Sequence, residues 1–170
     1  MAQERLITQI DYARAGKITP QMEAVAAKEH KTPEEIRAGV VKGCIAIPAN
    51  IHHAALSPEG VGEGMRTKVN VNLGISGDLM NAEMELEKVR TAIELGAEGI
   101  MDLSNHGKTH DFRKHLIDMS PAMIGTVPMY DAIGYLEKPL IGITAQDFLD
   151  VVRAHAEDGV DSVSYTHLRA

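Results

Sequence analysis

The sequence has little of several residue types, and each shortage excludes a class of protein. It has one cysteine, Cys44, so no disulfide can form within the chain, and we expect a reducing, cytoplasmic location. Tryptophan is absent and aromatic residues make up 4%, so the core must consist mainly of aliphatic side chains, methionine and alanine. No apolar run is long enough to span a bilayer, and no signal-peptide core follows Met1. We therefore expect no membrane partner.

Basic residues are also outnumbered. The chain has 17 Lys and Arg against 24 Asp and Glu, a net charge of −7, which argues against nucleic acid as the main partner. Its 170 residues, 44% of them hydrophobic, suit one domain or part of a larger one. Cys44 alone cannot hold a metal cluster, and we expect it to be a small buried apolar residue.

The first third of the sequence is predicted to be mainly helical. Residues 6–15 and 20–30 have helical character, and Thr19-Pro20 provides a cap followed by a first-turn proline. Thr32 can cap a third helix with Glu35 three residues on, a capping box, and this helix should end near Gly39 or Gly43. An extended piece follows, and the glycine-rich residues 57–64 are predicted to be a loop.

From residue 68 strands and helices alternate, a pattern typical of an α/β fold with a parallel sheet. Two closures fit it, an open doubly wound sheet and a (β/α)8 barrel. The first predicted strand has no Gly-x-Gly-x-x-Gly after it, which weighs against the dinucleotide-binding version. The predicted strands are 68–73, 99–103, 124–129 and one opening at Val160, and the predicted helices are 81–95, 109–119 and 144–158.

Polar side chains gather where these strands end, and in a barrel the carboxyl ends of the strands build the active site. For Asp102, anchoring a loop and acting in catalysis are equally open roles. A metal-dependent lyase or aldolase is disfavoured, because no lysine or carboxylate pair accompanies Asp102. The strand-end residues are Asn70, Asn72, Asp102, Ser104 and Tyr130.

Histidines and glutamates elsewhere are expected to have structural roles. His52 and His53 are adjacent on an extended segment and should point to opposite sides, so they should not form a metal pair. His106 and His110 are separated by a loop glycine, which argues against a metal site there. Three glutamates are expected on a solvated helix face: Glu83, Glu85 and Glu87.

Five segments, taken together and in order, resemble the phosphomethylpyrimidine synthase family. The resemblance covers nearly the whole chain, roughly residues 8–161. Each segment is short, and their order and spacing make the resemblance specific. The segments are 13–23 (ARAGKITPQME), 47–53 (IPANIHH), 68–74 (KVNVNLG), 100–104 (IMDLS) and 120–130 (SPAMIGTVPMY).

The resemblance implies a radical S-adenosylmethionine enzyme of thiamine biosynthesis. Such an enzyme uses a 4Fe–4S cluster and S-adenosylmethionine, with zinc or another divalent metal, to convert 5-aminoimidazole ribonucleotide to hydroxymethylpyrimidine phosphate. It also implies a homodimer, and a TIM-like (β/α)8 barrel of which this chain holds about the first three and a half units after a small helical region. Carried over by position, the substrate contacts are Asn72, Met101 and Tyr130. Asn72 can donate and accept hydrogen bonds, Tyr130 can offer its hydroxyl to phosphate or ribose, and Met101 can line the imidazole.

The family's cluster ligands form a Cys-x-x-Cys-x4-Cys pattern near its C-terminus, and its two metal-binding histidines also lie downstream. Neither is present here, so we expect an N-terminal fragment that holds neither cluster nor metal and does not catalyse alone. The expected division is a helical and extended region at 1–66, the first part of the barrel at 67–162, and a tail at 163–170. This tail resembles a translated transposon-end sequencing adapter, so we expect it not to be native.

Two other functions stay open. The chain departs from the commoner family pattern around the predicted strands and in loops that would shape the pocket. The departures are at Leu73, 75–78, 104–109, 122–123, Met129 and Asp131. A sister branch, the 5-hydroxybenzimidazole synthases of anaerobic cobamide synthesis, uses the same substrate and differs in its product. The chain could instead be a non-catalytic partial barrel that binds a nucleotide.

Overall fold

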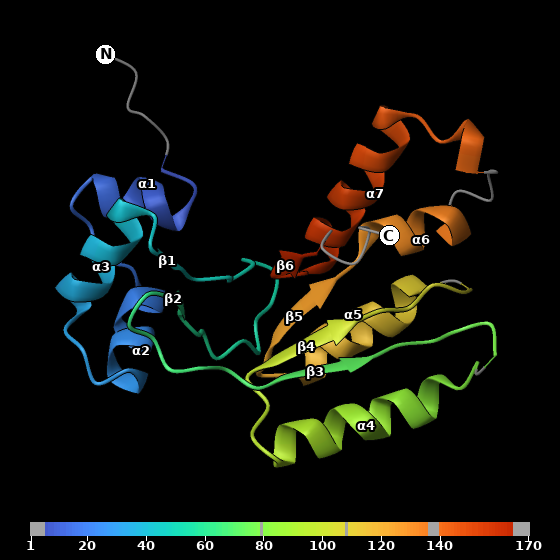
Figure 1. The fold of residues 1–170 in the computed structure, drawn as a ribbon, viewed down its shortest axis with the longest axis horizontal. Helices are drawn as coiled ribbons and strands as arrows, with labels where there is room; N and C mark the ends of the chain where they lie inside the picture. The colour runs from blue at the N-terminus through green and yellow to red at the C-terminus, as the bar shows by residue number, and fades with distance from the viewer. Residues whose placement is uncertain (1–5, 79, 108, 136–139, 165–170) are drawn as a thin grey trace. The chain divides into compact units, whose positions relative to one another are not determined.

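The chain folds as two compact units, and Figure 1 shows the helices and strands that belong to each. The computed structural model describes residues 6–78, 80–107, 109–135 and 140–164. The first unit consists of Met1–Pro48 and Ser57–Lys68, and the second of Ala49–Leu56 and Val69–Ala170. The short segment Ala49–Leu56 therefore belongs with the second unit, although the sequence pattern placed it in the N-terminal region.

Threonine caps start the three helices of the first unit. The side chain of each threonine accepts a backbone N–H of the first turn, and Thr32 forms the predicted capping box with Glu35. The third helix ends at Gly43, whose φ of +73° suits glycine. The helices are α1 (Gln9–Arg14), α2 (Pro20–Lys28) and α3 (Pro33–Lys42), capped by Thr8, Thr19 and Thr32.

A two-stranded antiparallel ribbon completes this unit, and two predictions were wrong there. The ribbon pairs β1 (Ile45–Ala46) with β2 (Val61–Gly62), so the predicted loop at 57–64 contains a strand. Cys44 is exposed rather than buried. Side chains alternate along this extended segment, and Ile45 takes the buried side while Cys44 and Ala46 face solvent.

The second unit contains the predicted parallel sheet. Its four strands follow one another in chain order, which confirms an α/β fold with a parallel sheet. The helix predicted at 109–119 has these bounds in the structure. The strands are β3 (Asn70–Leu73), β4 (Gly99–Asp102), β5 (Met123–Thr126) and β6 (Ser162–Val163); the helices are α4 (Ala82–Glu94), α5 (Thr109–Met119), α6 (Pro128–Tyr135) and α7 (Ala145–Asp158), with a 3₁₀ turn at Leu140–Gly142.

Three of these helices cover one face of the sheet. Leu73, Ile100 and Ile124 project to this face and form a core with α4 and α5. Thr126 projects to the same face, and its hydroxyl lies 2.8 Å from Nδ1 of His155 on α7. The apolar side chains that α4 and α5 contribute to this core are Leu86, Val89, Ala92, Phe112, Leu116 and Ile117.

The third predicted strand ends earlier than expected. The sequence pattern continued it to Met129, but β5 ends at Thr126 and Pro128 begins α6. Proline fits the first position of a helix, because its fixed φ is helical and no N–H is needed there. Tyr130 therefore lies in the first turn of a helix rather than at a strand tip.

The expectation of a fully solvated glutamate face on α4 was also wrong. Glu85 is 1% exposed. Its carboxylate accepts the backbone N–H of Gly74 at 2.9 Å, just after β3, and pairs with Lys88 at 2.6 Å. Glu83 and Glu87 are exposed, as predicted. Glu85 therefore links α4 to the carboxyl end of the first strand.

The segment Ala49–Leu56 is held to the second unit through Asp161. Its carboxylate accepts the backbone N–H of Asn50 and of Ile124, each at 2.8 Å, and lies 2.7 Å from Nδ1 of His53. His53 is buried and His52 is exposed, so the two side chains differ as expected, but the segment is a turn, closed by the His53 N–H and the Asn50 carbonyl at 3.1 Å, rather than extended. Both histidines lie near the amino ends of β5 and β6, whereas a barrel site would form at the carboxyl ends of the strands.

Candidate functional site

The candidate site is the sheet face opposite the helices, which we call the Asn72 face. In the parallel register Asn72 pairs with Met101, and Met101 pairs with Gly125. Partners in register project to the same side of a sheet, and alternate residues of each strand project to the other side. The Asn72 face is therefore formed by Asn70, Asn72, Gly99, Met101, Met123 and Gly125.

Two of the predicted substrate contacts are thus neighbours. Asn72 is exposed and Met101 is half-buried. The side chain of Met101 extends over Gly125, since a Cβ added to that glycine would lie 2.2 Å from its sulfur. Glycine at position 125 therefore leaves the space that Met101 occupies on the face.

The carboxamide of Asn72 has a defined partner. Nδ2 of Asn70 donates to Oδ1 of Asn72 at 2.9 Å. Because the amide oxygen already accepts one hydrogen bond, a ligand can use the two N–H groups of Asn72 and the second lone pair of that oxygen. The prediction that Asn70 lies at the carboxyl end of its strand was wrong, because it is the first residue of β3, and it orients Asn72 from there.

Tyr130 lies beyond the carboxyl end of β5, in the first turn of α6. Its backbone N–H donates to the carbonyl of Val127 at 2.9 Å, and the residue is half-buried. The structure brings Asn72 and Met101 together in the register and carries Tyr130 on a separate element. The predicted roles of all three as substrate contacts remain predictions.

Asp102 and Ser104 belong to the other side of the sheet. Asp102 alternates with Met101, and its carboxylate is buried and accepts the N–H and hydroxyl of Ser104 at 2.9 and 2.5 Å. The Ser104 hydroxyl accepts the N–H of Ile75 at 2.9 Å, which joins the loops after β3 and β4. Burial raises the pKa of Asp102, and the Ser104 hydrogen bonds oppose this only in part. Of its two open roles, the structure supports the loop anchor.

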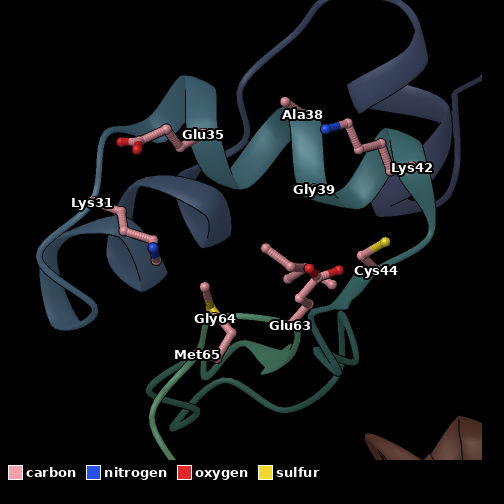
Figure 2. A pocket seen from close by; sticks show the side chains of 10 residues that line it. Lys31, Glu35, Ala38, Gly39, Lys42, Cys44, Glu63, Gly64 and Met65 are labelled. Carbon is pink, nitrogen blue, oxygen red and sulfur yellow. The ribbon is translucent and has the colours of Figure 1, made fainter.

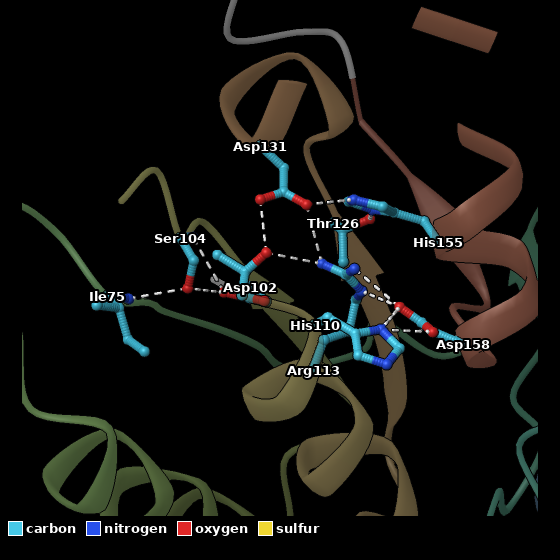
Figure 3. A network of polar contacts seen from close by, with 10 residues as sticks. Ile75, Asp102, Ser104, His110, Arg113, Thr126, Asp131, His155 and Asp158 are labelled. Atoms are coloured by element: carbon cyan, nitrogen blue, oxygen red, sulfur yellow. Dashed lines mark hydrogen bonds and ion pairs between the residues drawn. The ribbon is translucent and has the colours of Figure 1, made fainter. Parts of the chain in front are cut away.

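A buried charged network beside the strand ends was missed from sequence. Arg113 on α5 is 1% exposed and lies between two carboxylates, Asp131 and Asp158 (Figure 3). A signal was present, because Arg113 falls within the apolar stripe of its helix. That stripe follows helical spacing through Thr109, Phe112, Arg113, Leu116 and Ile117, all of them buried.

The residues present do not fit an iron–sulfur cluster, which needs several thiolates. The sequence has one cysteine, and the described residues contain no group of three His, Cys, Asp or Glu side chains that could hold a metal. Cys44 lines a hollow of about 360 Å³ in the first unit, where two lysines and two glutamates give mixed charge (Figure 2). His106 and His110 form no metal group either, and His110 pairs with Asp158 at 3.0 Å.

The fold and this face define an α/β protein whose parallel sheet presents Asn72 and Met101 one residue before the carboxyl ends of β3 and β4, next to the edge where small-molecule sites form in such sheets. In the part of the chain that the structure describes, no helix combines the length and apolarity needed to cross a membrane. The model of the radical SAM ThiC family matches residues 8–167. The chain belongs to this family.

Relatives with high identity carry one printed name, phosphomethylpyrimidine synthase. The chain is 62% identical over 157 residues to that of Alkaliphilus metalliredigens, covering 92% of this chain and 36% of the relative. It is 58% identical to that of Clostridioides difficile with the same coverage, and 60% identical to that of Clostridium tetani, covering 91% and 34%. The chain therefore spans about a third of the length of these relatives.

Proposed function

We propose that the chain is part of a phosphomethylpyrimidine synthase, which converts 5-aminoimidazole ribonucleotide to hydroxymethylpyrimidine phosphate for thiamine synthesis. The observation that carries this proposal is the identity of 58–62% to relatives of that name over nine-tenths of the chain. The same name favours the pyrimidine product over the benzimidazole product of the sister branch. A cytoplasmic location and a homodimer belong to the same proposal.

The proposed architecture is the first part of a (β/α)8 barrel. The strands follow one another in chain order, β3 to β6, and α4, α5 and α7 pack on one face. A doubly wound sheet would reverse its strand order and carry helices on both faces. The Asn72 face would then line the barrel interior, and the carboxyl strand ends would form its mouth.

Within that barrel we assign substrate contact to Asn72, Met101 and Tyr130. The N–H groups of Asn72 that Asn70 leaves available would donate to ribose or phosphate oxygens. Met101 is half-buried and apolar, so it would pack against the imidazole ring without exchanging protons. Tyr130 would offer its hydroxyl from the mouth.

The cluster and metal would be held by other parts of the protein. When bound, the 4Fe–4S cluster and S-adenosylmethionine supply a 5′-deoxyadenosyl radical, and we propose zinc or another divalent metal as a further cofactor. This chain's residues would bind the ribonucleotide, orient it and exclude water from it. No nucleic acid or membrane partner is proposed.

The test uses the protein encoded by the whole gene that contains this sequence, up to the stop codon of that gene. The protein is reconstituted anaerobically and incubated with 5-aminoimidazole ribonucleotide, and its product is identified. We expect hydroxymethylpyrimidine phosphate as the product. Asn72→Ala should lower kcat/KM by about tenfold or more, because it removes a hydrogen bond to a charged ligand.

Gln146→Ala serves as the matched control, since this exposed carboxamide lies on α7. It should leave kcat/KM unchanged. A benzimidazole product, or failure to turn over the ribonucleotide, would overturn the assignment. Equal effects of the two variants would remove Asn72 from the proposed site.

A further inference from the structure

Asp131, the residue after Tyr130, accepts three hydrogen bonds in the buried network near the strand ends. It is 4% exposed. Its Oδ1 accepts the hydroxyl of Thr109 at 2.5 Å, and its Oδ2 accepts Nη1 of Arg113 at 3.1 Å and Nε2 of His155 at 2.9 Å (Figure 3). These donors come from two helices, α5 and α7, so one carboxylate joins three helices.

The donors are themselves fixed. Arg113 Nη1 also donates to the Thr109 hydroxyl at 3.1 Å, and its Nε donates to Asp158 at 2.8 Å. Nδ1 of His155 lies 2.8 Å from the hydroxyl of Thr126, the last residue of β5. The network therefore connects the start of α6 back to the end of the strand that precedes it.

This anchor fixes the rotation of α6 about its own axis. Successive residues of a helix are about 100° apart around the axis, so holding Asp131 against α5 and α7 also sets the direction of Tyr130. Among the α6 side chains whose burial the structure describes, Pro128, Asp131 and Ala132 are buried, and Asp131 is the one of these three that makes hydrogen bonds to neighbouring helices. A buried carboxylate with three directional donors fixes the rotation of a helix turn more strictly than small apolar contacts do.

We propose that Asp131, held by Arg113, His155 and Thr109, is the positioning residue that directs Tyr130 toward the substrate. The proposal rests on the proposed function, because it takes Tyr130 as a ribonucleotide contact. It adds a group that touches no substrate and acts through its neighbour.

The test compares Asp131→Asn with Asp158→Asn in the protein of the product assay, without its cluster. Both carboxylates are buried and both pair with Arg113, but only Asp131 lies in the first turn of α6. We expect Asp131→Asn to raise the Kd for 5-aminoimidazole ribonucleotide about tenfold, as displacement of a contact residue does. Asp158→Asn leaves the three donors of Asp131 in place and keeps an oxygen that can accept Nε of Arg113, so it should leave that Kd unchanged.

A second readout follows Tyr130 directly. With fluorotyrosine incorporated, the ¹⁹F resonance that disappears in Tyr130→Phe should shift in Asp131→Asn and stay in place in Asp158→Asn. His155→Gln can keep an N–H donor for Asp131 and should retain the wild-type ¹⁹F shift and Kd. His155→Leu removes that donor and should change both.

The outcomes separate the two proposals. If wild-type protein does not bind the ribonucleotide, or Tyr130→Phe binds it as tightly, the substrate assignment fails. If Tyr130→Phe weakens binding but Asp131→Asn leaves both the Kd and the ¹⁹F shift unchanged, the positioning role fails. Equal effects of Asp131→Asn and Asp158→Asn would also overturn it, since they would show only a general loss of packing.

Discussion

At the residue scale, His53 is positively charged, because both of its ring nitrogens face hydrogen-bond acceptors. Nε2 lies 2.8 Å from the carbonyl oxygen of Ser120, which can only accept, so Nε2 carries a proton. Nδ1 faces the Asp161 carboxylate at 2.7 Å. Burial acts to lower the pKa of His53, but the Asp161 carboxylate and the Ser120 carbonyl outweigh it, and the pKa is raised above its usual value.

The stability of the chain should therefore depend on pH through His53. A raised folded-state pKa gives stability that is complete below the unfolded value of about 6.5 and is lost as pH rises through the folded value. His53→Ala should lower the free energy of unfolding by about 3 kcal/mol at pH 6, because it leaves Asp161 buried without its cation. Urea unfolding followed by circular dichroism at pH 6 and pH 9 measures both effects.

His52→Gln is the control, because His52 is exposed beside His53. It should keep the wild-type loss of stability between the two pH values, and His53→Ala should lack that loss. Identical pH dependence in wild type and His53→Ala would contradict the charged state of His53.

Single residues differ in how far local sequence predicts them. The different burial of His52 and His53 was predicted from an extended backbone, whereas the structure has a turn there. The partner of His53 was not predictable, because Asp161 lies 108 residues away along the chain. Cys44 was expected to be buried because free cysteine is usually a buried residue type, but it lies on the exposed side of the extended segment, opposite Ile45. Asn72 and Met101 were named through a resemblance, and the register then showed that they share one face.

At the element scale, α4 shows one charged residue acting as a structural anchor. Glu85 binds the N–H of Gly74, a glycine with φ +148° whose added Cβ would lie 2.6 Å from the backbone N of Ser104. No side chain fits at Gly74 without moving the loop after β4. The helix, the first strand and that loop are thus mutually fixed.

Glu85→Ala should therefore destabilise the chain by about 2 kcal/mol, because it removes a charge-assisted hydrogen bond and leaves the partly buried N–H of Gly74 without this partner. The measurement is the urea midpoint at neutral pH. Glu87→Ala on the exposed side of the same helix should change stability by less than about 0.5 kcal/mol. A Glu85→Ala midpoint equal to that of Glu87→Ala would show that the Gly74 contact contributes nothing.

Helix ends were easier to predict than strand ends. Thr32 with Glu35, and Gly43 and Gly159 with left-handed φ, are local signals with a local mechanism, and the structure has all of them. Pro128 is ambiguous, because proline suits both the end of a strand and the first position of a helix. The Arg113 network could not be predicted as a network, since its members come from three helices and one strand.

At the scale of the whole molecule, the chain provides a sheet face but not a cluster site. One cysteine cannot ligate a 4Fe–4S cluster. We expect the 170-residue chain, incubated anaerobically with iron, sulfide and thiol and then desalted, to retain neither iron nor visible charge-transfer absorption. Stoichiometric iron and sulfide that disappear in Cys44→Ser would contradict this expectation.

The α/β class and the parallel sheet were predictable because strands and helices alternate at regular spacing. The division of the chain into two units was harder to predict. In the first unit the carboxylate of Glu29 is buried, because it pairs with Lys68 and accepts the backbone N–H of Arg66 at 2.7 Å. Such pairs bring together residues almost forty positions apart, and hydropathy patterns contain no trace of them.

The membership of Ala49–Leu56 in the second unit imposes an order in time during protein synthesis. Asn50 leaves the ribosome 111 residues before Asp161, the residue whose carboxylate receives its N–H. At synthesis rates of about 5–20 residues per second, this segment waits roughly 6–22 seconds for its partner. During that interval His53 has no buried counterion and stays hydrated. The second unit can therefore close only after residue 161 has emerged, whatever the first unit has already done.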